Sequence, residues 1–344
     1  MPPIASASSR RDFLRFLGGS ILSISLTGCP RSATDKATVF RLGHCSVPGK
    51  PLFDVTNVFA EMVNRESERR IQIEVFGQGK LGDSRLVMES TSVGTLDMSC
   101  EAPLSPVVPE MALLELPYLF VDAQHAAKNL EGPFGQALAE RAKSRDVVVL
   151  GYFIDTARCI FNRYRDVRTP DDLHGLKIRV PEGAVWLEMM NRFGAIAIPL
   201  SWGEVYTAIE QHVIAGAETD LISIERACFY ETCKHVSETN HVLLVYPLIM
   251  NKHLFDSLSP SDQALLRRAC REAARKERSQ LKEKLSLARK KLESHGVSII
   301  QVDQAPFRER VLQMHNRYAK KVHAEDLLKL ITPPEKPPLA ESKQ

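Results

Sequence analysis

The chain has 344 residues, and its 45 lysines and arginines against 42 aspartates and glutamates give a formal net charge of +3. Part of this charge comes from Arg10, Arg11 and Arg15 near the N-terminus. The remainder is nearly neutral, which argues against nucleic acid or an anionic membrane surface as the partner. The length is compatible with two domains or with one large domain.

Residues 1–28 predict a cleaved export signal. Arg10 and Arg11 lie in the twin-arginine pattern S-R-R-D-F-L, and a short apolar stretch and the sequence Leu-Thr-Gly-Cys follow. The apolar stretch is too short for a membrane span, which needs about 20 residues. The last four residues fit a lipoprotein cleavage site, so we expect Cys29 to carry the lipid that anchors the mature protein in the periplasm. Residues 29–37 read as a tether.

Hydrophobic periodicity then predicts strands that alternate with helices. Strands are expected at residues 38–44, 71–76, 96–100, 147–151, 158–163, 176–180, 195–199, 217–221, 239–248 and 297–302. Helices are expected at residues 52–67, 86–92, 124–142, 184–193, 204–211, 261–294 and 305–331, with a break at Gly132-Pro133 in the third. This order indicates an α/β protein with mainly parallel sheets. The tail, residues 332–344, is rich in proline and charge and is predicted to be disordered.

The cysteines beyond Cys29 show no zinc-binding pattern, because no C-x-x-C pair occurs. The ten histidines also lack metal-ligand spacing, so we predict no metal site. Most of the remaining thiols are expected to be buried as small apolar groups. Cys228 and Cys233 are the one local pair for which a disulfide is worth testing.

A glycine-rich turn follows the strand at 71–76. Gly77, Gly79 and Gly82 form G-x-G-x-x-G, and Asp97 follows downstream. This spacing is typical of a dinucleotide site and would make the protein an exported NAD(P)-dependent oxidoreductase. However, the strand is polar on one face, whereas the first strand of such a fold is buried on both. An ordinary glycine turn that leads into a helix is the alternative.

Arg179 and His44 are candidate ligand-binding residues from their positions alone. Arg179 stands near the end of the strand at 176–180, and open α/β sheets bind ligands at the carboxyl ends of their strands. Its planar guanidinium suits a carboxylate, because it donates two parallel hydrogen bonds. A surface ion pair is the alternative for a lone arginine in a strand. His44 follows the first strand and either faces a cleft or is hydrogen-bonded within its loop.

Six segments resemble the solute-binding subunits of tripartite ATP-independent periplasmic (TRAP) transporters, of the C4-dicarboxylate-binding (DctP) type. The segments are 76–82, 93–98, 116–120, 172–181, 204–209 and 216–218, in the order and spacing of that family. The resemblance spans about residues 39–330. It implies an α/β fold of the periplasmic-binding-protein type II, in which two lobes are joined by crossover strands and a long bridging helix. We expect lobe I at 38–155 and 245–283, and lobe II at 156–244 and 284–331.

The resemblance also implies a mechanism of capture without chemistry or cofactor. A small organic acid is held between the lobes and delivered to a TRAP-type membrane permease, and the glycine turn binds no nucleotide. A sensor that feeds a signalling partner is the other interpretation.

Several ligand contacts follow from the same resemblance. Arg179 matches the arginine that clamps the ligand carboxylate, Arg158 matches a second arginine, and Trp202 matches an aromatic ring against the ligand. Thr219 stands where many members have asparagine, which leaves the identity of the ligand open. Positions that vary with the ligand are Glu101, Arg85 and Tyr246.

Overall fold

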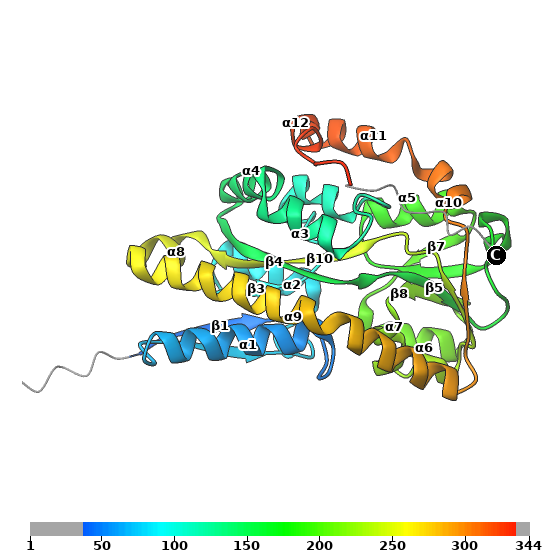
Figure 1. Cartoon of the computed structure of the whole chain (residues 1–344), viewed down its shortest axis with the longest axis horizontal. Coiled ribbons are helices and arrows are strands. Elements are labelled where there is room, and N and C mark those ends of the chain that lie inside the picture. The colour runs from blue at the N-terminus through cyan, green and yellow to red at the C-terminus, as the bar shows by residue number, and fades with distance from the viewer. Residues whose placement is uncertain (1–36, 335–344) are drawn as a thin grey trace, which may run out of the picture. The chain divides into compact units, whose positions relative to one another are not determined.

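The structure is a computed structural model that describes residues 37–334 (Figure 1). The predicted export signal with Arg10 and Arg11, the lipidation site Cys29, and nearly all of the tether lie outside the described residues, as does the tail beyond residue 334. No helix within 37–334 combines the length and the apolar character that a membrane crossing requires.

The described strands form two sheets. The five-stranded first sheet has the order β2-β1-β3-β10-β4, built from β1 (Thr38–Gly43), β2 (Ile71–Phe76), β3 (Met98–Cys100), β4 (Val147–Ala157) and β10 (Leu243–Asn251). The six-stranded second sheet has the order β11-β9-β5-β8-β6-β7, built from β5 (Cys159–Asn162), β6 (Lys177–Val180), β7 (Ile196–Pro199), β8 (Gly216–Thr219), β9 (His235–Glu238) and β11 (Ser298–Gln301).

Helices connect these strands. The α-helices are α1 (Pro51–Glu66), α2 (Ser84–Val93), α3 (Ala123–Glu131), α4 (Pro133–Ala142), α5 (Ala184–Phe193), α6 (Val205–Glu210), α7 (Leu221–Arg226), α8 (Lys252–Ser257), α9 (Pro260–Ser294), α10 (Ala305–Val311), α11 (Met314–Lys321) and α12 (Glu325–Leu328). Short 3-10 helices are η1 (Pro109–Glu115), η2 (Lys143–Arg145), η3 (Pro170–Leu173), η4 (Trp202–Glu204) and η5 (Phe229–Glu231).

Two strand connections join the sheets, as predicted. β4 ends at Ala157, and after Arg158 the chain enters the second sheet as β5. The chain returns from β9 to β10 through residues 239–242. The backbone N–H of Arg158 donates to the carbonyl of Val242 at 2.8 Å, so the two crossings are hydrogen-bonded to each other. The two strand connections therefore lie side by side, next to Arg158.

The crossings also explain why the expectation of mainly parallel sheets is met only in part, with five parallel and four antiparallel pairs among the described strands. β10 is antiparallel to both β3 and β4, and β5 is antiparallel to both β8 and β9. The remaining pairs are parallel, as the helical connections between them require. Each sheet is mixed because strands that arrive from the other sheet enter it in the opposite direction.

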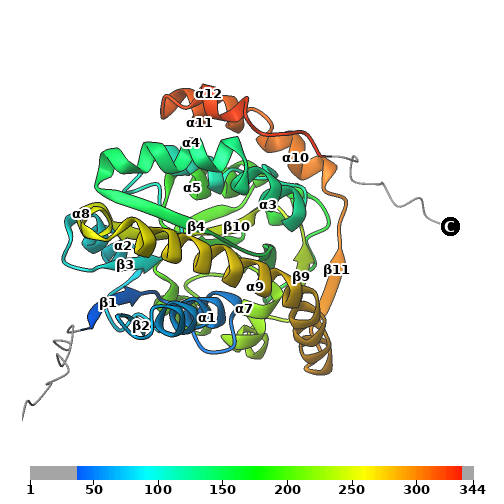
Figure 2. The same ribbon diagram turned by 60° about the vertical axis from the view of Figure 1, so that its left-hand side comes forward.

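The helix α9 bridges the sheets, as predicted. Pro260 occupies its first turn, and the Ser259 hydroxyl accepts the backbone N–H of Asp262 at 3.2 Å, which caps the N-terminus. The helix packs against α1 and β4 along its first part and against α7 farther on. Figure 2 shows α9 running beside α1 and continuing past α7.

Two of the expected helices are broken in the structure. The Gly-Pro break expected within 124–142 is confirmed, because α3 ends before Gly132 and Pro133 begins α4. The helix expected at 305–331 is divided into α10, α11 and α12. α11 contacts η1 and α12 contacts α4, so this end of the chain packs beside the first sheet rather than only within the second lobe. Thr332, where the disordered tail was expected to begin, donates its N–H to Asn129 Oδ1 at 2.7 Å.

Gly216 allows the close packing of β8 on β5, at the base of the strand that carries Thr219. A Cβ at this position would lie 2.0 Å from the carbonyl oxygen of Phe161, a backbone atom that cannot move aside. We expect Gly216→Ala to lower the free energy of unfolding by about 3 kcal/mol, from overpacking. Gly203→Ala is the matched control, because no heavy atom lies within 4 Å of its Cβ position. Denaturant titration of both variants checks this, and equal stability would contradict it.

Candidate ligand-binding site

A cavity of about 740 Å³ has walls from both sheets. The first-sheet side contributes the loop after β1, the glycine turn, the start of α2 and the loop after β3. The second-sheet side contributes the ends of β6 and β8 and the segments that follow β6 and β7. Its volume suits a small molecule and falls in the range of ligand sites.

Arg179 is a buried cation at the wall, with 4% of its surface exposed. Its Nε and Nη2 donate to the carbonyl of Leu200, at 2.9 and 2.8 Å, which fixes the guanidinium against the end of β7. Among residues 37–334 no carboxylate forms an ion pair with it and Nη1 has no partner. Burial lowers the pKa of Arg179 to about 10, and Glu218 offsets this only in part. The Nη1–Nη2 edge is therefore free for an external carboxylate.

Arg158 lines the same cavity but is paired within the protein. Its Nε and Nη2 donate to the two carboxylate oxygens of Glu218, and Nη2 also donates to the Glu218 carbonyl at 2.7 Å. Burial opposes the charge of Arg158, yet the adjacent Glu218 carboxylate leaves its pKa above the ordinary value. His241 lies 3.3 Å from the same carboxylate. Arg158 thus keeps only Nη1 for a ligand.

Trp202 joins the two sides of the cavity. The Arg179 guanidinium lies 5.7 Å from the centre of its ring, and the ammonium of Lys50 lies 5.2 Å from it. Both distances are within the range of cation–π attraction. Since Lys50 comes from the first-sheet side and Trp202 from the second, this indole contacts cations from both walls.

Glu101 is a buried carboxylate on the first-sheet side, with 5% of its surface exposed. It accepts hydrogen bonds from the backbone N–H of Cys45 and, at 3.0 Å, from the hydroxyl of Ser84. Burial raises its pKa, and these two donors and the nearby Lys50 offset the rise in part. Its position is thereby fixed by the loop after β1 and the first turn of α2.

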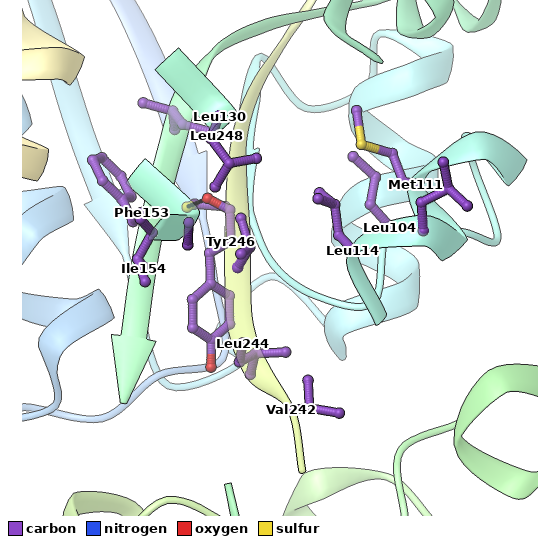
Figure 3. Close-up of a cluster of buried hydrophobic side chains, with 14 of the residues drawn as sticks. Leu104, Met111, Leu114, Leu130, Phe153, Ile154, Val242, Leu244, Tyr246 and Leu248 are labelled. Atoms are coloured by element: carbon purple, nitrogen blue, oxygen red, sulfur yellow. Dashed lines mark hydrogen bonds between the residues drawn. The ribbon is translucent and has the colours of Figure 1, made fainter. Parts of the chain in front are cut away.

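Thr219 and Tyr246 also line the cavity, both nearly buried. The hydroxyl of Thr219 lies 3.3 Å from Asp220 Oδ2, so it is partly engaged within the protein. Figure 3 shows the Tyr246 ring beside Leu244 on β10, with its hydroxyl at the Leu244 end of the ring. Burial raises the pKa of this phenol well above its ordinary value, so the hydroxyl stays protonated.

Two predicted residues differ from the others: Arg85 lines the cavity but is exposed and paired, and His44 lies outside the lining. Arg85 lines the cavity, but its side chain is 62% exposed and pairs with Glu89 at 2.7 Å. His44 does not line the cavity and is fully buried. Its Nδ1 accepts the N–H of Ser46 at 3.1 Å, and its Nε2 lies 3.2 Å from the Thr56 hydroxyl. Of the two roles considered for His44, the structure therefore supports the histidine that is hydrogen-bonded within its loop and not the one that faces a cleft.

The glycine turn has structural reasons that need no dinucleotide. A Cβ at Gly77 would lie 2.7 Å from the Phe53 ring, and Gly79 and Gly82 have φ of +69° and +119°. Asp97, the expected ribose contact, instead accepts the backbone N–H of Arg41 at 2.7 Å. The glycines and Asp97, which together suggested a dinucleotide site, thus have separate structural roles within the protein.

Cys228 and Cys233, the pair for which a disulfide was worth testing, are both free thiols. Cys233 is buried, and Cys228 is partly accessible. Within residues 37–334 no cluster of three or more histidine, cysteine, aspartate or glutamate side chains has the arrangement of a metal site.

Lys50 is the main residue that the sequence analysis missed. It lines the cavity, is 7% exposed, and forms no ion pair among the described residues. It stands at the N-cap of α1, where its side chain makes no capping bond. Polar side chains such as serine or aspartate are preferred there, and the helix dipole disfavours a cation. A lysine directly before the predicted helix, where it does not favour the helix start, is the sequence feature that could have indicated a functional role for Lys50.

Comparison with known proteins assigns the family. The profile described as "Bacterial extracellular solute-binding protein, family 7" (DctP) matches residues 42–321. The chain belongs to this family. It is 31% identical over 281 residues to the 2,3-diketo-L-gulonate-binding periplasmic protein of Escherichia coli. The aligned region covers 79% of this chain and 85% of that protein.

Solved structures agree with this assignment. A TRAP periplasmic solute-binding protein from Chromohalobacter salexigens with bound D-glucuronate has a TM-score of 0.81 at 29% identity, covering 85% of this chain and 98% of that one. One from a Sulfitobacter species with bound β-D-galacturonate has a TM-score of 0.81 at 26% identity, covering 86% and 99%. The two-lobe fold is confirmed, and the protein is a solute-binding protein rather than the oxidoreductase of the alternative interpretation.

Glu115 is buried beside Trp186, which lines the cavity. Its Oε1 accepts the backbone N–H of Ser105 at 3.3 Å, and its Oε2 lies with Trp186 Nε1 near Gly183. Burial raises the pKa of Glu115 from 4.5 to about 7. The folded protein therefore holds this proton more tightly than the unfolded chain does, and the associated stability is lost as the pH rises through about 7.

Replacing Glu115 by glutamine tests this. We expect the free energy of unfolding of Glu115→Gln, relative to wild type, to improve by about 2 kcal/mol between pH 5 and pH 8, because the variant has no proton to lose. Glu74→Gln, at an exposed position on β2, is the control and should show no such change. Denaturant titrations at both pH values measure it, and a difference that does not vary with pH would contradict it.

Proposed function

We propose that this protein captures a small organic acid between its two lobes and delivers it to a TRAP-type membrane permease. The observation that carries the proposal is the state of Arg179. A guanidinium that is 4% exposed, without an ion pair among the described residues, and with a free Nη1–Nη2 edge at a cavity wall is arranged for an external anion.

The ligands named for the relatives support a carboxylate. D-Glucuronate, β-D-galacturonate and 2,3-diketo-L-gulonate belong to three different proteins, and each contains a carboxylate group. In this chain Arg179 would bind that group, with Arg158 Nη1 as a second donor. Trp202 offers a ring against the carbon skeleton, and Thr219 and Tyr246 offer hydroxyl groups.

Capture is proposed to close the lobes. The two sheets meet at the crossings beside Arg158, and the cavity takes one wall from each side. A ligand that contacts both walls stabilises the closed arrangement more than the open one, and only this difference shifts the equilibrium. The closed form would then dock on the permease.

The location follows from the N-terminal signals and the family. We infer export by the twin-arginine pattern at Arg10 and Arg11 and a lipid on Cys29, which would anchor the protein in the periplasm with no other membrane contact. We further infer lobe I at 38–155 and 245–283, and lobe II at 156–244 and 284–331, with the last helices packed back on lobe I.

Arg179→Ala tests the proposal. We expect the dissociation constant for the acid to rise by about 30-fold or more, because truncating one partner of a buried charged pair costs about 2–5 kcal/mol. Arg65→Ala, at a side chain that is 73% exposed, is the control. A thermal-shift screen of organic acids identifies the ligand, and titration calorimetry compares the variants. Equal affinity of Arg179→Ala and wild type would refute the clamp.

A further inference from the structure

The cavity has a second polar end, built by Lys50 and Glu101. Lys50 comes from the start of α1 and Glu101 from the loop after β3, and both belong to the first-sheet side, opposite Arg179. Each is more than nine-tenths buried, at 7% and 5% exposure. Buried ionic groups in a cavity wall are costly unless they are paired, so their presence calls for a ligand.

Lys50 and Glu101 interact electrostatically but do not form an ion pair with each other. The Lys50 ammonium lies close enough to Glu101 to lower the pKa of that carboxyl, yet the two form no ion pair. A ligand hydroxyl between them would accept from the ammonium and donate to the carboxylate at the same time. The Glu101 carboxylate is preorganised for this role, because hydrogen bonds from the Cys45 N–H and the Ser84 hydroxyl fix its position.

The spacing of the two ends suits a short carbon chain. Lys50 Nζ and Arg179 Cζ lie 5.2 and 5.7 Å from the centre of the Trp202 ring. They are therefore at most 10.9 Å apart, the sum of these distances. An acid whose carboxylate is on Arg179 and whose chain crosses Trp202 would place its far hydroxyl groups at Lys50 and Glu101.

The charges of the buried wall residues set the charge of the ligand. Arg158 is paired with Glu218, whereas Lys50 and Glu101 carry opposite charges without forming an ion pair, so these four groups together with Arg179 sum to one positive charge. Two further buried carboxyl groups, Asp155 and Asp220, do not line the cavity. A second carboxylate on the ligand would approach Glu101, and like charges at close range in a buried site repel strongly.

We propose that Lys50 and Glu101 form a hydroxyl-binding subsite, which selects polyhydroxylated monocarboxylates and disfavours dicarboxylates of the same length. This inference rests on the proposed function, because it takes the carboxylate on Arg179 as given. It adds the class of acid and names the residues that choose it.

The test uses two open-chain acids with the same six-carbon skeleton. D-Galactonate ends in a hydroxymethyl group and galactarate ends in a second carboxylate. D-Galacturonate and succinate complete the set. Titration calorimetry on the full mature chain should show D-galactonate or D-galacturonate binding at least about 10-fold more tightly than galactarate, and succinate more weakly than either monocarboxylate. Tighter or equal binding of galactarate or succinate would overturn the inference.

Substitution at the subsite gives the second part of the test. Glu101→Gln keeps the shape and removes the negative charge, so the preference for the monocarboxylate over galactarate should shrink by about 10-fold. Lys50→Gln should weaken the monocarboxylate and leave the preference in place. Glu74→Gln and Lys80→Gln, both at exposed positions, are the matched controls. An unchanged preference in Glu101→Gln would overturn the charge argument.

The two levels of the proposal fail in different ways. If these hydroxylated acids do not bind, while another carboxylate binds and loses affinity in Arg179→Ala, then the subsite is wrong and the proposed function stands. If no acid in a broad panel binds with dependence on Arg179, both are wrong.

Discussion

The buried guanidinium of Arg179 is the constraint on which the account depends. A cation that is taken out of water without an internal counterion is unfavourable, and here the loss shows as a lowered pKa. The protein holds it in place through two hydrogen bonds to the Leu200 carbonyl, after the neighbouring strand, and through the ring of Trp202. The anion that we propose for this site would supply the missing negative charge, so the free-energy cost of the buried cation would favour the bound state. Arg158 shows the contrast, because its partner Glu218 is internal and permanent.

The fold places this arginine where two separately built walls meet. β6 brings Arg179 to the carboxyl end of one sheet, while the loops after β1 and β3 bring Lys50 and Glu101 from the other. The sheets are joined beside Arg158, where the crossing strands are hydrogen-bonded, and by the bridging helix α9. A site divided in this way couples binding to the relative position of the walls, which is what a capture-and-release protein needs.

The sequence predicted what depends on local pattern or on the resemblance. The positions of β6 and Arg179 follow from alternation and strand-end geometry, and the resemblance added Arg158, Trp202 and Glu101, which all line the cavity. It could not predict contacts between distant segments. Lys50 meets Trp202 across about 150 residues of chain, and the Arg158–Glu218 pair joins strands whose antiparallel order no local pattern specifies. His44 was ambiguous for the same reason, because its partner Thr56 becomes a neighbour only when α1 packs on the loop after β1.

The most direct measurement is a crystal structure of the protein with the tightest-binding acid of a panel. The account predicts the ligand carboxylate within about 3 Å of Arg179 Nη1 and a hydroxyl group of the same ligand between Lys50 and Glu101. A ligand whose carboxylate lies away from Arg179, or an Arg179 side chain that points into bulk solvent, would contradict it.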